Sequence, residues 1–306
     1  MSSGKNRNTG HSIFQKLLNL AKKNREDFNY LLLRYGVERL LYRLSVSSFA
    51  DKFILKGASL FLVWQGRSYR VTKDADLMSF GSPDVSRLSK IFKEVCCIPC
   101  EEDGIVFQPD SVLAAPIRED QLYGGIRITV KGKLDHAAVP VQFDIGFGDA
   151  VVPAPERVSF PTLLDTPAPE INAYTRYTVI AEKFHAMVLL DMANSRMKDF
   201  FDIWMLNKAF NFDGAFLCKA IQSTFERRQT GIPEDIPVAF SPEFSEDKQK
   251  QVQWKAFLRK TKSEAVPGNL QSAIDGLIRF LMPVLDALRH KKMLKKTWNT
   301  DSSTWQ

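Results

Sequence analysis

Two aspartates separated by one residue, Asp74 and Asp76, begin a segment whose alternation predicts a β-strand over residues 75–80. Side chains two apart on a strand point to the same face, so both carboxylates can meet at one site. Two carboxylates this close repel each other unless a cation lies between them. Magnesium sites use one or two carboxylates together with substrate phosphates. Leu77 and Met78 follow the pair, which indicates a strand entering the core instead of a solvated turn.

A third acid, Asp144, lies within an apolar segment at 141–146 that also predicts a strand. An acid in such a strand is costly unless a charged group meets it. On a strand next to Asp74 and Asp76, it would complete a two-metal site for in-line phosphoryl chemistry. Lys56 and Gly57 follow the predicted strand 53–55. A glycine at a strand-to-helix turn can let backbone amides approach a phosphate, although this pattern, taken alone, favours a plain tight turn.

The second half of the chain carries charged residues on otherwise apolar helical segments. They are Lys183, Arg196, Lys198, Asp199 and Asp202. Asp199 and Asp202 are three residues apart and therefore share one helix face. Such clusters are usually surface ion pairs, but Phe200 and Phe201 indicate a largely buried helix, so these charges need partners.

The elements that position these residues form two different halves. Periodicity predicts helices at 12–21 and 26–45 and strands at 53–55, 75–80, 104–107, 126–131 and 139–145. A Pro-rich connector at 155–175 follows, and from residue 178 the pattern is almost entirely helical. The prediction is an α+β fold with N-terminal helices (1–50), a mixed α/β core (51–160), a helical domain (161–290) and a basic tail (291–306).

Composition excludes several classes of protein. The 306 residues are 44% hydrophobic and 25% charged, which argues against wholesale disorder. No run of about 18 apolar residues predicts a transmembrane helix, and the polar start of the chain does not resemble a secretory signal. Cys97 and Cys100 have zinc-like spacing, but no second such pair follows. We therefore expect a soluble cytoplasmic protein with reduced thiols and no contact with a membrane.

The net charge of +7 is concentrated at the two ends of the chain. Residues 1–25 contain Lys and Arg and no acid, and residues 289–306 contain five Lys and Arg against Asp301 alone. The ordinary explanation is solvated termini, and contact with nucleic acid phosphates is the alternative.

Taken together, these motifs resemble the AbiEii/AbiGii toxin family of nucleotidyltransferases, the toxin half of type IV toxin–antitoxin and abortive-infection systems. The resemblance covers roughly residues 28–290. The residues that carry it are Leu55-Lys56-Gly57-Ala58, Arg70-x-Thr72-x-Asp74-x-Asp76-Leu77, Gln142-x-Asp144-Ile145-Gly146, Glu182-Lys183-Phe184-x-Ala186 and Arg196-x-Lys198-Asp199-Phe200-x-Asp202. Each motif alone is unspecific, but their order and spacing are specific.

The resemblance implies a nucleotidyltransferase-like core, a helical domain lining the nucleotide cleft, and a Mg²⁺-dependent reaction of an NTP that releases pyrophosphate. Asp74, Asp76 and Asp144 would hold the metal, with Lys183 and Asp199 as further catalytic groups. The NTP would be bound by Lys56, Gly57, Thr72, Lys183, Arg196, Lys198 and Asp202. The implied acceptor is RNA, such as a tRNA 3′ end, in a toxin–antitoxin or phage-defence setting with a cognate antitoxin encoded nearby.

Two alternatives remain open at this stage. A degenerate transferase could bind a nucleotide or a partner without catalysis, although Asp74, Asp76, Asp144, Lys183 and Asp199 are all retained. A transferase acting on a small molecule would differ only in its acceptor. The sequence contains no motif that reads a particular base.

Overall fold

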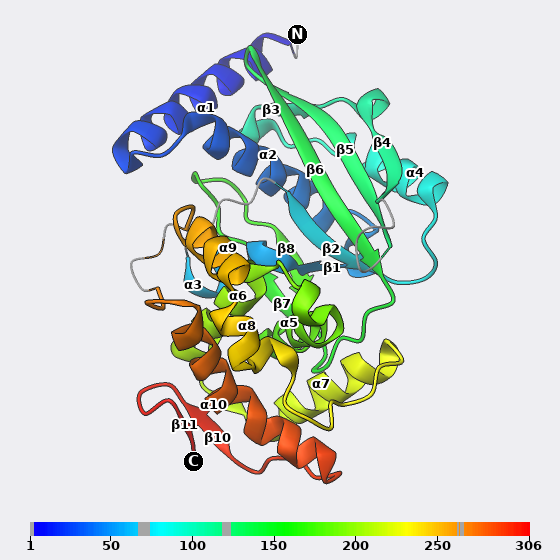
Figure 1. Ribbon diagram of the computed structural model, residues 1–306. Coiled ribbons are helices and arrows are strands. Elements are labelled where there is room, and N and C mark those ends of the chain that lie inside the picture. The colour runs from blue at the N-terminus through cyan, green and yellow to red at the C-terminus, as the bar shows by residue number, and fades with distance from the viewer. Residues whose placement is uncertain (1–2, 67–73, 118–123, 262, 264–265) are drawn as a thin grey trace. The chain divides into compact units, whose positions relative to one another are not determined.

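The computed structural model describes the whole chain except residues 1–2, 67–73, 118–123, 262 and 264–265 (Figure 1). The chain forms two compact units. Unit 1 contains residues 1–148 and 156–173, and unit 2 contains residues 149–155 and 174–306. The segment 156–173, which the sequence predicts as a Pro-rich connector, contributes two strands to unit 1. No helix in the described ranges is long and apolar enough to span a membrane.

Unit 1 is built on an eight-stranded mixed sheet in the order β3-β5-β6-β2-β1-β8-β7, with β4 also paired to β5. Its strands are β1 (Phe53–Lys56), β2 (Ala75–Ser79), β3 (Ile105–Phe107), β4 (Leu113–Ile117), β5 (Gly125–Leu134), β6 (Ala137–Phe147), β7 (Glu156–Ser159) and β8 (Glu170–Ala173). Its helices are α1 (Ser3–Asn24), α2 (Phe28–Ser45), α3 (Leu60–Gln65) and α4 (Val85–Cys96).

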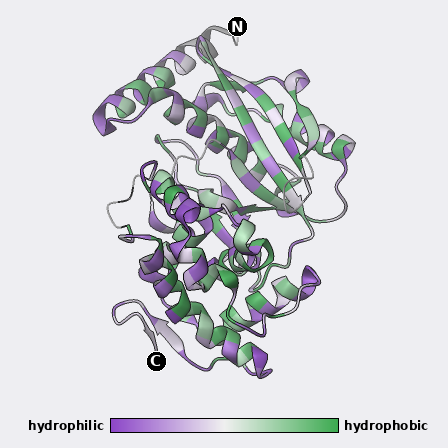
Figure 2. Ribbon diagram, viewed as in Figure 1, coloured by the Kyte–Doolittle hydropathy of each residue, from purple (hydrophilic) through white to green (hydrophobic). Residues whose placement is uncertain are grey.

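The centre of the sheet combines parallel and antiparallel pairs. β2 runs parallel to β6, whereas β1 is antiparallel to β2 and β5 is antiparallel to β6. Hydrophobic and hydrophilic residues alternate along β5 and β6 (Figure 2), and burial alternates with the same period. One face of these strands is therefore in the core and the other is available for polar side chains.

Helix α2 is joined to the rest of unit 1 by a buried ionic network. Arg39 and Arg43 both pair with the carboxylate of Asp103, at 3.0 and 2.7 Å, and all three side chains are almost fully buried. Glu38 accepts a hydrogen bond from the backbone of Leu163, and burial raises the pKa of Glu38 to about 7. Because a buried charge without its partner is strongly destabilising, this network fixes α2 against the segments at 103 and 163.

Unit 2 is mainly helical, as the sequence predicts for this part of the chain. Its helices are α5 (Arg176–Leu190), α6 (Met197–Ala209), α7 (Gly214–Arg227), α8 (Pro242–Glu246), α9 (Lys248–Leu258) and α10 (Leu270–Arg289). A small sheet joins β9 (Phe212–Asp213), β10 (Thr297–Asn299) and β11 (Thr304–Trp305). The predicted basic tail thus contains two strands, and Trp298 on β10 is 1% exposed. The observed mixed sheet and helical second unit confirm the predicted fold class.

Candidate functional site

Four charged residues form a row across the central strands of unit 1. The register pairs Lys56 on β1 with Asp76 on β2, Asp76 with Asp144 on β6, and Asp144 with Arg127 on β5. Residues directly opposite one another on neighbouring strands lie on the same face of the sheet. The row therefore places two adjacent acids between two bases, on the polar face of the sheet.

Asp74 lies immediately before β2 and is tied to the same row. The Gln142 side-chain amide donates to Asp74 Oδ2 at 3.3 Å and to Asp144 Oδ1 at 3.4 Å. One amide group therefore bridges two of the three predicted acids. The structure brings Asp74, Asp76 and Asp144 together, as the spacing of the motifs predicts.

Gly57 provides the space that the Asp76 carboxylate occupies. The φ angle of Gly57 is +74°, a conformation that favours glycine, and a Cβ built at this position would overlap the carboxylate of Asp76. Any other residue at position 57 would displace this acid or distort the turn after β1. Gly57 is thus required by the turn and also by this row of charged residues with Asp74 beside it, which we call the acid row.

Arg127 is a partner of the row that is not among the residues the sequence singles out. Its guanidinium donates to both oxygens of Asp144, from Nε at 2.8 Å and from Nη2 at 2.7 Å. Hydrogen bonding to Asp144 raises the pKa of Arg127, against the opposing effect of desolvation. Bidentate pairs of this kind are among the stronger ionic contacts in proteins, so Asp144 is neutralised within the protein itself.

This pairing bears on which acids could hold a metal ion. Within the described residues, no group of three or more His, Cys, Asp and Glu side chains is already arranged around a common metal position. Asp74 and Asp76 supply two carboxylates, which fits the way Mg²⁺ binds through one or two carboxylates and substrate phosphates. Asp144 could join them only if Arg127 moved away from it. The role of Asp144 as a metal ligand stays a prediction.

Unit 2 contains a second set of predicted residues that lie close together, which we call the Lys183 cluster. Lys183 on α5 donates to Asp199 at 2.7 Å and lies 2.8 Å from Asp202, both on α6. Arg196 Nε donates to the other oxygen of Asp199 at 2.6 Å. Asp199 is fully buried, whereas the Arg196 side chain is 37% exposed. The charges on these apolar helices therefore partner one another, and α5 and α6 are joined by them.

The electrostatics of this cluster favour the charged form of Asp199. Burial alone raises the pKa of Asp199, but attraction to Lys183 and then to Arg196 outweighs burial and holds the pKa below its ordinary value. Asp199 also lies in the first turn of α6, where the helix dipole favours a negative charge. Lys198 is exposed and lowers the pKa of Asp199 further. Thr72, the remaining predicted residue, lies outside the described residues.

The Arg127–Asp144 pair leads to a prediction about metal binding. Replacing Arg127 with Met should raise the affinity for Mg²⁺ about tenfold or more, because it leaves a further uncompensated carboxylate beside Asp74 and Asp76. Calorimetric titration of the nucleotide-free protein with Mg²⁺ measures this change. Arg157→Met, at a half-exposed arginine on β7, is the control with the same change in charge. Equal affinities in the two variants would place Asp144 outside the reach of the metal.

The Lys183 cluster leads to a prediction about stability. Lys183→Ala leaves Asp199 and Asp202 buried without their shared cation, which should lower the free energy of unfolding by about 3 kcal/mol or more. Lys198→Ala, at an exposed lysine on α6, should change it by less than about 0.5 kcal/mol. Urea denaturation at neutral pH measures both.

The lowered pKa of Asp199 determines how the free energy of unfolding changes with pH. Its pKa is lowered by folding, so the stabilisation is present at neutral pH and is lost as the pH falls below the ordinary pKa of 3.8. The difference between wild type and Lys183→Ala should therefore shrink in acid. A difference that is already absent at pH 7 would show that the cluster does not hold α5 and α6 together.

Two of the solved structures that are similar to the chain come from Helicobacter pylori. JHP933 from Helicobacter pylori has 14% identity and a TM-score of 0.39, covering 89% of this chain and 97% of that one. A putative nucleotidyltransferase from H. pylori has 15% identity and a TM-score of 0.35, covering 76% and 94% respectively. No curated protein sequence matches the chain.

The family comparison covers both units. The model of the nucleotidyl transferase AbiEii toxin family, of type IV toxin–antitoxin systems, matches residues 39–279. The matched range contains the acid row of unit 1 and the Lys183 cluster of unit 2. It spans most of the chain, and it ends before the basic segment that follows α10. The protein therefore belongs to the AbiEii family of nucleotidyltransferase toxins.

Proposed function

We propose that this protein is a Mg²⁺-dependent enzyme that transfers a nucleoside monophosphate from an NTP to a hydroxyl group of RNA, with a tRNA 3′ end as the acceptor. The observation that carries the proposal is the row Lys56–Asp76–Asp144–Arg127 with Asp74 beside it, all on one face of the sheet. Adjacent carboxylates on a polar sheet face are the donor set expected for metal-assisted phosphoryl transfer. Membership of the AbiEii family supports the same class of reaction.

The reaction exchanges one phosphorus–oxygen bond for another. The acceptor oxygen forms a bond to the α-phosphorus, the bond from that phosphorus to the bridging oxygen breaks, and pyrophosphate leaves. When bound by Asp74 and Asp76, Mg²⁺ would neutralise the charge of the triphosphate. Asp144 would accept the proton of the acceptor hydroxyl if Arg127 releases it, or it would serve as a further metal ligand. Lys56 and the Gly57 turn would bind phosphate oxygens, as would Thr72.

The residues of unit 2 would contribute to nucleotide binding. Lys183 and Arg196 are cations that could neutralise the charge that develops on the phosphates. Asp199 and Asp202 orient Lys183 through contacts of 2.7 and 2.8 Å. In this proposal Asp199 acts on the reaction through Lys183, and the exposed Lys198 adds positive charge nearby. The family also implies a cognate antitoxin as a protein partner.

Replacement of Asp76 tests the proposal. Asp76→Ala should abolish transfer of label from an α-labelled NTP to total RNA, while the melting temperature in metal-free buffer stays the same or rises slightly, because removal of one acid of the pair relieves repulsion with Asp74. The stabilisation by Mg²⁺ and NTP together should shrink, since a ligand at 100 times its Kd contributes about 2.7 kcal/mol. Asp110→Ala, at an exposed acid of the same unit, should leave both measurements unchanged.

Three other results would contradict parts of the proposal. Wild-type labelling by Asp76→Ala would show that this acid does not hold the metal. Unfolding of the variant would show that Asp76 is a structural acid. Label recovered in a small molecule instead of RNA would identify the alternative transferase class.

A further inference from the structure

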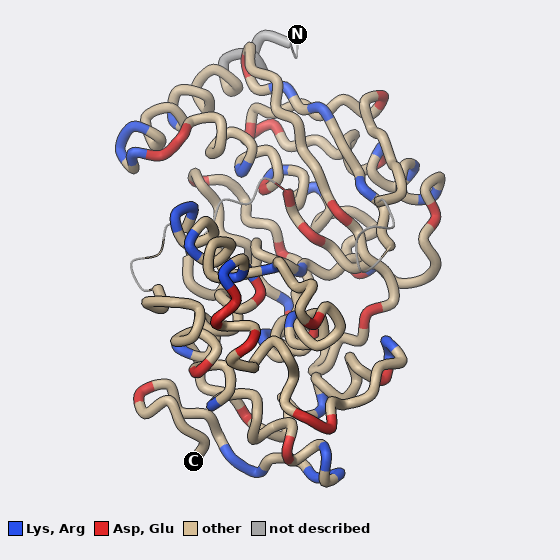
Figure 3. The backbone as a smooth tube through the Cα atoms, viewed as in Figure 1, with Lys and Arg blue, Asp and Glu red and all other residues tan. Residues whose placement is uncertain are grey.

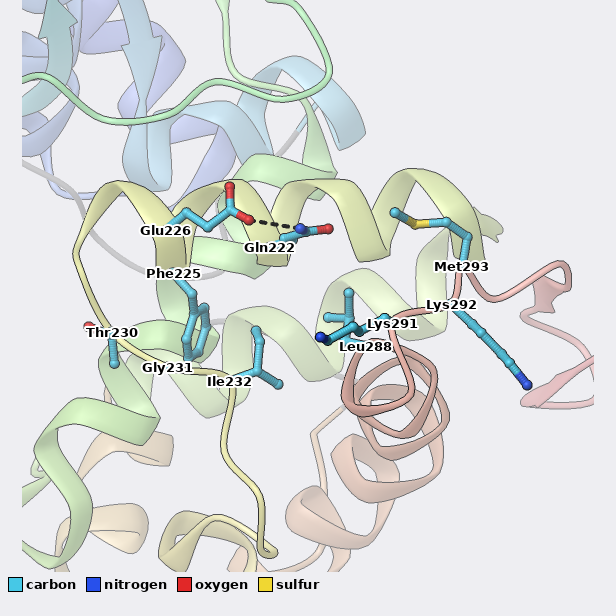
Figure 4. Close-up of a pocket in the computed structure, with 10 residues that line it drawn as sticks. All are labelled: Gln222, Phe225, Glu226, Thr230, Gly231, Ile232, Leu288, Lys291, Lys292 and Met293. Atoms are coloured by element: carbon cyan, nitrogen blue, oxygen red, sulfur yellow. Dashed lines mark hydrogen bonds between the residues drawn. The ribbon is translucent and has the colours of Figure 1, made fainter.

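A cavity of about 490 Å³ lies within unit 2, beside the end of α10. Its wall is formed by α7, by the loop at 230–232 and by the residues around the end of α10. Figure 4 shows Phe225, Ile232 and Leu288 pointing into the same space from these three segments. The volume is within the range of small-ligand sites, and the wall combines apolar side chains with a few polar groups.

The rim of this cavity is strongly basic. Lys291 and Lys292 line it, and Lys295 and Lys296 follow within the same exposed segment. Figure 3 shows this concentration of Lys and Arg at the end of α10 and just after it. Within the part of the chain that the structure describes, none of these four lysines forms an ion pair. Arg289 differs from them because it pairs with Asp286 at 2.8 Å.

The single acid of the cavity wall is engaged within its own helix. Glu226 accepts a hydrogen bond from Gln222, at 2.7 Å, one turn earlier on α7. Another cavity in this unit is lined by one acid and one base, Glu246 and Lys255, and so has no net charge. Because the Gln222 amide is neutral, it does not balance the charge of Glu226, and the lining of the cavity beside α10 combines apolar side chains with two lysines and one carboxylate, a net positive charge.

These features fit a single-stranded RNA better than they fit an acidic protein. Closely spaced lysines bind successive phosphates of a nucleic acid backbone without reading its sequence. Unpaired bases are commonly bound in apolar or aromatic recesses next to such a backbone track. An acidic peptide would use the lysines but would have no need of the cavity.

We propose that the surface formed by Lys291, Lys292, Lys295, Lys296 and the adjacent cavity docks a single-stranded segment of RNA, with its phosphates on the lysines and one base in the cavity. This inference rests on the proposed function in identifying the docked strand with the acceptor. RNA binding itself can be measured without NTP and without turnover.

The charge contribution is tested with a fluorescent single-stranded RNA of about 16 nucleotides. The variant Lys291→Gln, Lys292→Gln, Lys295→Gln, Lys296→Gln should raise the Kd about tenfold or more at moderate salt. It should also reduce the slope of log Kd against log salt by about 3, because each phosphate contact on a single strand contributes about 0.7. The control carries the same change in charge on α9 and in the two residues after it: Lys248→Gln, Lys255→Gln, Arg259→Gln, Lys260→Gln, all exposed.

The cavity contribution is tested at Gly231, which lines it. A Cβ at this position meets no atom within 4 Å, so the backbone there can carry a side chain, and Gly231→Leu adds apolar bulk to the lining. This variant should weaken binding of the RNA but leave the salt slope and the binding of inorganic polyphosphate unchanged. Polyglutamate serves as the acidic protein probe. An equal loss of RNA affinity in the α9 control would overturn the proposal. It would also be overturned if polyglutamate bound as tightly as RNA and Gly231→Leu had no effect on RNA binding.

Failure of the docking surface can be distinguished from failure of the proposed function. Asp76→Ala should bind RNA like the wild type while transferring no label. RNA binding through this surface by a protein that transfers no nucleotide would contradict the proposed function alone. Transfer to RNA with an unchanged KM for RNA in the four-lysine variant would contradict the docking surface alone.

Discussion

The site depends on one constraint, which is the register that places Asp76 directly opposite Asp144 on two parallel strands. Two neighbouring carboxylates repel, so the sheet must supply compensation on either side. Lys56 and Arg127 occupy the flanking strands in the same row, and Gly57 leaves room for the Asp76 carboxylate. A slip of one residue would turn Asp76 towards the core, where Ala75 and Leu77 are now fully buried. The apolar face therefore fixes the position of the acids.

The acid row of unit 1 and the Lys183 cluster of unit 2 both pair carboxylates with cations, but the two clusters differ in their exposure to solvent. In unit 1 the acids lie on a half-exposed sheet face, and Arg127, whose side chain is 41% exposed, can exchange its contact with Asp144 for water or another anion. In unit 2 Asp199 is fully buried, and its contact with Lys183 joins α5 to α6, while Arg196 pairs with it at the start of α6. Lys183 therefore contributes to stability and, in the proposed function, would also bind the nucleotide, whereas Arg127 affects mainly the charge of the acid row.

Several features of this arrangement can be predicted from the sequence. The strands that carry the acids follow from their alternation, and Lys183 and Asp199 stand out because they are charges on apolar helices. Arg127 could also have been found, because a two-residue turn at Asp135–His136 pairs Leu134 with Ala137 and so brings Arg127 opposite Asp144. The pairing of Lys56 with Asp76 is different. A long connection joins their strands, and no local turn fixes its register. Likewise β7 and β8 lie in a proline-rich segment with little alternation.

If the acid row serves nucleotidyl transfer, the phosphate that reaches RNA must be the α-phosphate of the NTP, and a radioactive label can identify it. The wild-type protein is incubated with Mg²⁺, total RNA and each NTP in turn, labelled either at the α- or at the γ-phosphate. We expect RNA to acquire the α-label from at least one NTP, the γ-label to appear only in pyrophosphate, and chelation of Mg²⁺ to stop both. Transfer of the γ-label to RNA would identify a kinase, and the absence of either label from RNA with all four NTPs would contradict the proposed reaction.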